Sequence, residues 1–591
     1  MTRTGRRPAI AALLALCALG ALVLVPSLGR AVATPALFRV GAATRDISPT
    51  AAEIATDRLF MGGYGFGSGR VGTQTQYVQD PTGTLEPRTA VGVMGKDATG
   101  KDIVNKNPFA PWVRAIAIGD GTKTIVLVDH DNQGTFPTYK PNVSTGALRP
   151  YGFDDIRAAA AAKAPGLDAR SIVISSDHSH AGQDLTGVWG FVPDEYLKRT
   201  SELAVDAIVA AYTSMRPAIL KQSAIETPQP CGPDSGSPLR IFANQFCGGS
   251  PVGQLGDEWE HANDHTNAQI RVLRAFAPGS TKPFAVLINA AIHATVGGSG
   301  NRYLSSDWVS TLSEYIEQQD AGATAVTIVG DVGRTQPNDR ACVVNPATPG
   351  RFLEPLSQNL VRYDLDPRAP DSCPISQFAR RVQAWVNEAV AKTERAITTS
   401  GVDYREMFIR DASNSVILFG ANYGGDLAGI PINRGIFPPY LTGTVLGTWV
   451  GAYRVGDLLM LSAPGEAYPS IRDGVLAAVR TTQPTWIFGL ANDQLGYLIA
   501  PTPEGYPEPI RKSFFDGDPH DPSTWGVSPI DNDNYFFNVS PTIGDHVMCT
   551  MIKGALDLGF GAAAGSPPKC ALWNLEPNES GPGDPTWKPP A

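Results

Sequence analysis

The sequence lacks a second long apolar run, an excess of basic residues, closely spaced cysteine pairs and the Gly-x-Ser-x-Gly motif of many serine hydrolases. After the N-terminal region no segment stays apolar for 18 residues, so no further membrane-spanning helix is expected. A net charge of −9 gives no support to nucleic-acid binding. The missing Cys-x-x-Cys spacing argues against a cysteine zinc site, and the missing serine motif argues against a serine nucleophile.

The N-terminus has the pattern of an export signal. Basic residues are followed by an apolar run from about Ala9 to Val25 and then by the small-x-small sequence Ala31-Val32-Ala33. We therefore expect residues 1–33 to be a cleaved signal peptide and the protein to be secreted or extracytoplasmic. An uncleaved N-terminal anchor is the alternative, because the run is nearly long enough to span a bilayer.

The cysteine content fits export. Six cysteines follow the expected signal, and an even count in an oxidising compartment predicts three disulfides. Other connectivities and buried free thiols remain alternatives. Their grouping along the sequence suggests the pairs Cys231–Cys247, Cys342–Cys373 and Cys549–Cys570.

The rest of the chain has the composition of a globular protein and the pattern of an α/β fold. Of the 591 residues 42% are hydrophobic and 18% charged, and 61 Gly and 49 Pro indicate many turns. Buried-strand patterns alternate with helical ones, as in a strand over 171–175 and a helix over 307–319. This predicts one large catalytic domain over residues 34–565, with a mixed sheet and helices. Long Gly/Pro-rich insertions are expected at about 221–262, 340–375 and 501–534, and an irregular C-terminal tail over 566–591.

Residues of catalytic types follow the ends of predicted strands, where ligands bind in open α/β sheets. His178 and His180 form a His-x-His, which places both rings on one side of a strand. His293 follows a second strand, Glu466 stands in a Pro-Gly-Glu turn after a third, and Tyr497 follows a fourth. Imidazole and carboxylate groups bind zinc, and a further imidazole can act as acid or base. The alternatives are a hydrogen-bonded structural histidine pair and a Glu466 that complements a helix N-terminus.

Together these segments resemble the neutral (alkaline, non-lysosomal) ceramidase family. The family motif Thr-His-Thr-His-Ser-Gly is similar to Asp177-His178-Ser179-His180-Ala181-Gly182. The family's second metal histidine, in Val-His-Gly-Thr, matches His293 in Ile292-His293-Ala294-Thr295, and its Pro-Gly-Glu ends at Glu466. Further matches, in the family's order and over roughly residues 37–550, are Met61-Gly62-Gly63-Tyr64, Ser305-Ser306-Asp307, residues 329–338, residues 489–492 and Tyr535.

The resemblance implies a zinc-dependent amidohydrolase with one zinc ion per chain. Its ligands would be His178, His293, Glu466 and Tyr497. His180 would be the general acid/base, and Tyr535 an oxyanion or substrate contact. Thr335, or Gln336 in another alignment, would take the place of a family serine, and Thr335 is the candidate for a further catalytic residue. The expected reaction is hydrolysis of the N-acyl amide bond of ceramide, or a related N-acyl lipid at a membrane or micelle surface, to a fatty acid and an amine. No obligate protein partner is expected.

The sequence also departs from the family pattern. The family's Thr-Thr-Glu-Glu-Tyr run is replaced after Tyr497 by Ile499-Ala500-Pro501-Thr502 and a long loop. Only 56 residues follow Tyr535, so the family's C-terminal immunoglobulin-like domain is not expected. Arg240 is a candidate for the family's catalytic arginine. Other N-acyl amides therefore stay open as substrates.

Two further alternatives belong to other classes. One is an exported binding protein that has the same fold without catalysis. The other adds a structural Ca²⁺ or Mg²⁺ ion held by Asp129, Asp131 and Asp307, since these cations prefer oxygen ligands. Hydrogen bonding within strand-end loops explains the same three carboxylates without a metal.

Overall fold

The computed structural model of the chain supports a description of eighteen ranges. They are residues 37–50, 52–53, 59–63, 75–79, 85–89, 93–96, 102–104, 111–142, 145–190, 192–230, 240–244, 266–297, 304–333, 335–338, 375–412, 445–499, 538–539 and 543–564.

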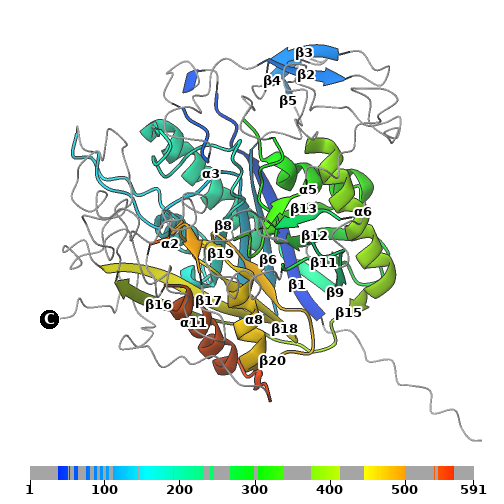
Figure 1. Ribbon diagram of the computed structural model, residues 1–591. Coiled ribbons are helices and arrows are strands. Elements are labelled where there is room, and N and C mark those ends of the chain that lie inside the picture. Colours follow the sequence, from blue (N-terminus) through cyan, green and yellow to red (C-terminus); the bar gives the residue numbers. More distant parts are fainter. Residues whose placement is uncertain are drawn as a thin grey trace, which may run out of the picture.

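A nine-stranded mixed sheet forms the centre of the molecule (Figure 1). Its order is β13-β12-β11-β9-β1-β6-β7-β8, with β15 paired to β9. The β7–β8 and β12–β13 pairs are parallel, and the other pairs are antiparallel. The strands are β1 (Leu37–Asp46), β6 (Trp112–Gly119), β7 (Thr124–His130), β8 (Ile172–Ser176), β9 (Arg216–Glu226), β11 (Gln269–Phe276), β12 (Pro283–Ala290), β13 (Thr324–Val329) and β15 (Arg395–Ala396).

Helices cover one face of this sheet, and a second sheet packs on the other face. The second sheet has four strands in the order β16-β17-β18-β21, and its outer face carries two helices. Its strands are β16 (Val402–Ala412), β17 (Val445–Val455), β18 (Leu458–Ser462) and β21 (Trp486–Phe488). The helices on the large sheet are α2 (Phe153–Lys163), α3 (Asp194–Thr213), α5 (Asp307–Gln319) and α6 (Ile375–Thr393), and those on the small sheet are α8 (Pro469–Ala478) and α11 (Ile543–Asp557).

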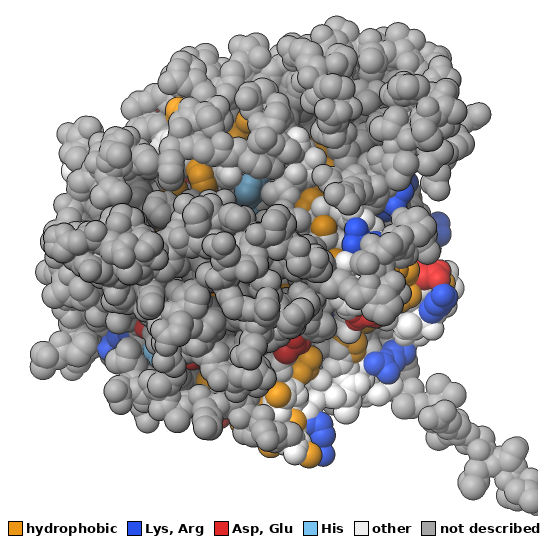
Figure 2. Space-filling view, in the orientation of Figure 1, with side chains coloured by type: hydrophobic (Ala, Val, Ile, Leu, Met, Phe, Trp, Pro, Cys, Tyr) orange, Lys and Arg blue, Asp and Glu red, His pale blue; other side chains and the backbone are white. Residues whose placement is uncertain are grey.

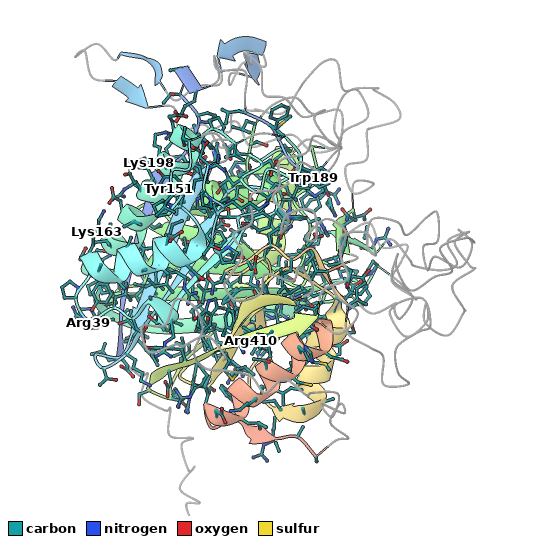
Figure 3. All side chains as sticks on the ribbon, turned by 90° about the vertical axis from the view of Figure 1, so that its left-hand side faces the viewer. Arg39, Tyr151, Lys163, Trp189, Lys198 and Arg410 are labelled. Carbon is teal, nitrogen blue, oxygen red and sulfur yellow. The ribbon has the colours of Figure 1, made fainter. Side chains whose placement is uncertain are left out.

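Side-chain alternation along the strands produces these four layers. On β6, Ile116 and Ile118 pack between the two sheets in one cluster with Met460 of β18. Ala115, which points to the opposite face, packs with Ile156 of α2. Both faces of the large sheet are therefore buried, which explains why β7, β8 and β12 read as nearly continuous apolar runs. Figure 3 shows side chains filling the space between α2 on one side and α8 and α11 on the other.

Short two-stranded pairs complete the described structure. The pair β19–β22 is parallel and follows the small sheet, and the pair β10–β14 is antiparallel. These and the remaining short elements are β10 (Phe242–Asn244), β14 (Thr335–Pro337), β19 (Glu466–Ala467), β22 (Tyr497–Leu498), β20 (Val479–Arg480), β23 (Gly561–Ala562), β2 (Thr75–Gln79), β3 (Leu85–Thr89), β4 (Val93–Lys96), β5 (Asp102–Val104) and the 3-10 turn η1 (Ala169–Ser171).

The predicted α/β class with a mixed sheet is confirmed, and α5 has the bounds expected for its helix. One boundary was wrong. The insertion expected from residue 221 begins later, because residues 221–226 pair with β11 as part of β9. The segments 1–33, 340–374, 501–534 and 566–591 lie outside the described residues.

Two other observations concern cysteines and membrane-spanning helices. Cys549, buried within α11, is the one cysteine of the six that lies in the described ranges, so the disulfide pairing stays a prediction. Within those ranges no helix is both long and apolar enough to cross a membrane.

Figure 2 shows charged side chains at the edge formed by β9, β15 and α6, where Lys221 and Arg274 both pair with Glu394.

Candidate metal centre

Three buried side chains from both sheets converge at the carboxyl ends of the strands. His178 follows β8, His293 follows β12, and Glu466 begins β19 directly after β18. Oε2 of Glu466 lies 3.3 Å from Nε2 of His178 and 3.0 Å from Nε2 of His293. One ligand atom from each residue lies within 4.8 Å of the others. We call these three residues the candidate metal centre.

Backbone carbonyls orient both histidines. The Nδ1–H of His178 donates to the carbonyl oxygen of Gln133 at 2.7 Å, and the Nδ1–H of His293 donates to that of Thr335, also at 2.7 Å. Since a carbonyl oxygen can only accept, these bonds fix the proton on Nδ1 and leave the Nε2 lone pairs for the centre. The indole N–H of Trp308 donates to the carbonyl oxygen of His293 at 3.0 Å.

The electrostatics of the centre favour a negative carboxylate. Burial alone would raise the pKa of Glu466, but His178 and His293 outweigh this and hold that pKa far below its usual range. Burial alone would lower the pKa of His178, but the Glu466 carboxylate outweighs burial and raises it. The Glu466 carboxylate and the His178 imidazole therefore stabilise each other's charged forms.

His180 stands beside the centre. Its Nε2 lies 3.4 Å from Nε2 of His178, and its ring centroid lies 6.1 Å from that of His293. Its backbone N–H donates to the carbonyl oxygen of Ala294 at 3.0 Å, which ties the two histidine segments together. Burial, and then the charges of His178 and His293, lower the pKa of His180 well below its usual value. His180 is therefore a neutral imidazole near neutral pH.

Gly63 explains the match of the segment that begins at Met61. A Cβ atom on Gly63 would lie 2.2 Å from Nδ1 of His180, so only glycine allows this close approach. The φ of Gly63 is +89°, which also favours glycine. The backbone of this segment is held by the bond from the N–H of Gly62 to the carbonyl oxygen of Gly182. The glycine-rich segment therefore forms one wall against His180.

The other predicted site residues differ in how they relate to the candidate metal centre. Tyr497 pairs with Glu466 in the parallel β19–β22 register, which brings it beside the centre. Thr335 reaches His293 through its backbone carbonyl, and its buried hydroxyl has no hydrogen-bond partner among the described residues. Arg240 donates to the carbonyl oxygen of Pro230 at 2.8 Å. Tyr535 lies outside the described residues.

Two of the three carboxylates considered for a second cation, Asp131 and Asp307, already accept hydrogen bonds. Asp131 accepts from the backbone N–H of Trp112 and from the hydroxyl of Ser310, both at 2.7 Å. Asp307 accepts from three backbone N–H groups, and burial raises its pKa to about 6. Burial and the neighbouring carboxylates raise the pKa of Asp129. In the ranges that the structure describes, the candidate metal centre is the one group of three such side chains with ligand atoms close enough to share an ion.

Sequence reasoning missed Gln133 and Trp308. Gln133 acts through its carbonyl oxygen, which every residue has, so its identity carries no signal. Trp308 follows the matched Ser-Ser-Asp segment directly, and its position beside that segment was the available signal.

The comparisons with known proteins establish the fold. No family model matches the chain, and no curated protein matches it. A crystal structure of neutral ceramidase from Pseudomonas aeruginosa aligns with a TM-score of 0.54 and 16% sequence identity, over 93% of this chain and 79% of that chain. A structure described as ceramidase complexed with C2 aligns with the same values. The predicted resemblance to the neutral ceramidase family is thus confirmed at the level of the fold.

Proposed function

We propose that the protein is a secreted zinc-dependent amidohydrolase that cleaves the N-acyl amide bond of ceramide or a related N-acyl lipid. The observation that carries the proposal is the candidate metal centre, with a neutral imidazole, His180, at 3.4 Å from one of its ligands. The fold shared with neutral ceramidase supports an amide-bearing lipid as substrate. Hydrolysis would release a fatty acid and an amine.

Zinc is the metal that suits these donors. Two imidazole nitrogens and a carboxylate oxygen are common zinc ligands, whereas Ca²⁺ and Mg²⁺ prefer oxygen alone. Both imidazoles already carry their proton on Nδ1, which leaves Nε2 ready to bind. We propose Tyr497 as a fourth ligand, because β22 brings it alongside Glu466.

The proposed mechanism uses His180 for proton transfer. A zinc ion held by these residues would polarise the amide carbonyl and acidify a water molecule. His180 accepts the proton of the water as its oxygen adds to the carbonyl carbon. The C–N bond then breaks, and His180 returns the proton to the leaving nitrogen. Tyr535 is proposed to stabilise the oxyanion, and Thr335 to position His293 through its carbonyl oxygen.

The remaining parts of the proposal concern location. A signal peptide over residues 1–33 would export the chain, and three disulfides would form in that compartment. An N-acyl lipid would be met at a membrane or micelle surface.

The test combines metal analysis with a substrate panel. Protein purified without chelator should hold one zinc per chain, lose turnover with a chelator and regain it with zinc. The panel contains N-acyl sphingoid bases, N-acyl amino acids and short polar amides, and the first class should turn over fastest. Fastest turnover of another class would favour a different N-acyl amide hydrolase. Zinc-free protein that binds lipid without turnover would instead support a binding protein.

A further inference from the structure

Asp177 organises the loop that carries His178. Its side chain is fully buried, and Oδ1 accepts the backbone N–H of Ser179 at 3.1 Å. A carboxylate that accepts an N–H two residues further along closes an Asx-turn, and His178 is the residue inside this turn. The same Oδ1 atom accepts the backbone N–H of Asn132 at 2.8 Å.

The turn holds His178 in an unfavourable backbone conformation. The φ of His178 is +58°, in the left-handed region where the Cβ of an L-residue crowds the backbone. A residue in that region persists only where its surroundings impose the conformation. The Asp177–Ser179 bond imposes it from one side, and the bond from His180 N–H to Ala294 imposes it from the other. The backbone conformation sets the direction in which the imidazole leaves the chain.

The second bond of Asp177 acts on the ring of the same histidine. Asn132 precedes Gln133, whose carbonyl oxygen accepts the Nδ1–H of His178. The amide of Asn132 is fixed in turn, because Nδ2 donates to the carbonyl oxygen of His130 at 2.8 Å and Oδ1 accepts from the hydroxyl of Ser176 at 3.1 Å. One oxygen atom of Asp177 thus holds both the backbone of His178 and the segment that orients its ring.

We propose that Asp177 is a positioning residue for the metal centre, which presets His178 for binding through Oδ1. The inference rests on the proposed function, since it requires that His178 binds a metal. Asp177 acts entirely through other residues. Among the described residues its second oxygen, Oδ2, is buried without a hydrogen-bond partner, so one acceptor atom carries the effect.

The test compares Asp177→Ala with Asp177→Asn. The amide oxygen of asparagine can accept the same two N–H groups, whereas alanine accepts neither. Zinc affinity is measured by competition with a chromophoric chelator, and the coordination geometry by the visible spectrum of the Co²⁺-loaded protein. Asp177→Ala should weaken zinc binding by about 10–100-fold and alter the Co²⁺ spectrum, as outer contacts of metal ligands do elsewhere. Asp177→Asn should stay within about threefold of the unaltered protein because it restores the acceptor.

Asp120→Ala is the matched control. Asp120 also accepts backbone N–H groups, those of Thr122 and Lys123, but at the turn before β7, whereas Asp177 lies at the carboxyl end of the neighbouring strand β8. This variant should lower the thermal midpoint and leave zinc affinity and the Co²⁺ spectrum unchanged. A midpoint loss shared by both alanine variants, with a zinc effect in Asp177→Ala alone, separates positioning from general stability.

The outcomes distinguish the two proposals. If the unaltered protein binds no zinc, the proposed function fails. If it binds zinc and Asp177→Ala binds it equally well, or Asp177→Asn loses as much affinity as Asp177→Ala, the positioning role is wrong. If the alanine variant does not fold, Asp177→Ser replaces it. A serine hydroxyl closes such turns more weakly, so the zinc affinity of Asp177→Ser should lie between that of Asp177→Asn and the value expected for Asp177→Ala. A zinc affinity of Asp177→Ser equal to that of Asp177→Asn overturns the inference.

Discussion

His178 and His293 present the same atoms to the candidate metal centre by different structural means. Both donate Nδ1–H to a backbone carbonyl at 2.7 Å, and both approach Oε2 of Glu466 with Nε2. His178 lies in the left-handed region inside a turn that follows β8. His293 follows β12, and its N–H donates to Thr335 while its carbonyl oxygen accepts from Trp308.

The difference shows that a histidine after a strand can be held in place with or without an unfavourable backbone conformation. At His293 the backbone φ is not positive, and hydrogen bonds to the Thr335 carbonyl and from the Trp308 indole hold it. At His178 the backbone departs from its preferred region, and a buried carboxyl group at the preceding position maintains it. The loop of His178 also carries a second histidine, His180. The matched segment around His293, Ile292-His293-Ala294-Thr295, has no second histidine.

We call His178 with its loop the His178 arm, and His293 with its contacts the His293 arm. The largest expected effect comes from Glu466, which both arms approach. Glu466→Gln removes the negative charge that both Nε2 atoms approach, at 3.3 and 3.0 Å, so both arms lose their shared partner. We expect the variant to lose bound zinc and, with it, amide turnover. Zinc per chain is measured by elemental mass spectrometry after dialysis.

Glu314→Gln is the control for this change. Glu314 is another buried glutamate, on α5, so its replacement tests the loss of a buried carboxyl group away from the centre. The control should keep stoichiometric zinc. Stoichiometric zinc in Glu466→Gln would show that the two histidines do not depend on their common partner.

The next effect separates catalysis from metal binding on the His178 arm. His180→Ala should retain zinc and lose about 10²–10⁴-fold in turnover, the usual contribution of a general acid/base. His546→Ala, which removes a histidine paired with Asp411 at 2.9 Å, is the control and should keep its turnover per folded molecule. Unchanged turnover in His180→Ala would assign the proton transfer to another group.

A smaller effect concerns pH. Burial and the neighbouring charges lower the pKa of His180 well below its usual value of 6.5, so its base form is already complete at pH 6.5. Raising the pH further adds no base, and activity should fall only well below pH 6.5, where the ring takes up a proton. We expect kcat/KM to stay within about twofold between pH 6.5 and 8 in the zinc-loaded protein. A His180 ring whose NMR signals titrate near pH 6.5 in the zinc-loaded protein would contradict the lowered pKa.

The positions of His178 and His293 at strand ends could be predicted from the sequence, but the contacts that orient them could not. Apolar strand patterns ending in His178 and His293 located both histidines of the candidate metal centre, because polar residues after buried strands meet at one edge of a sheet. Pairing across the two sheets was not predictable, since Glu466 reaches the histidines only after the sheets pack face to face. The carbonyl contacts of Gln133 carry no sequence signal. The positive φ of His178 could not be predicted, because histidine has no strong preference for that region and the Asp177 contacts that impose it are visible only in the structure.

The smallest expected effect tests the His293 arm through Thr335. The resemblance placed this residue near a family serine, whereas the structure shows its carbonyl oxygen on His293 and its hydroxyl buried without a partner. Thr335→Val keeps the carbonyl and replaces the hydroxyl by a methyl group of similar shape. Zinc affinity and turnover should be unchanged, and the thermal midpoint unchanged or slightly higher, because an unpaired buried hydroxyl contributes no hydrogen bond. Thr335→Pro, which keeps the hydrogen-bonding carbonyl but restrains the backbone of β14, should weaken zinc binding instead. A loss of turnover in Thr335→Val with zinc retained would return the hydroxyl to a catalytic role, and the two histidine arms would then each carry a catalytic group.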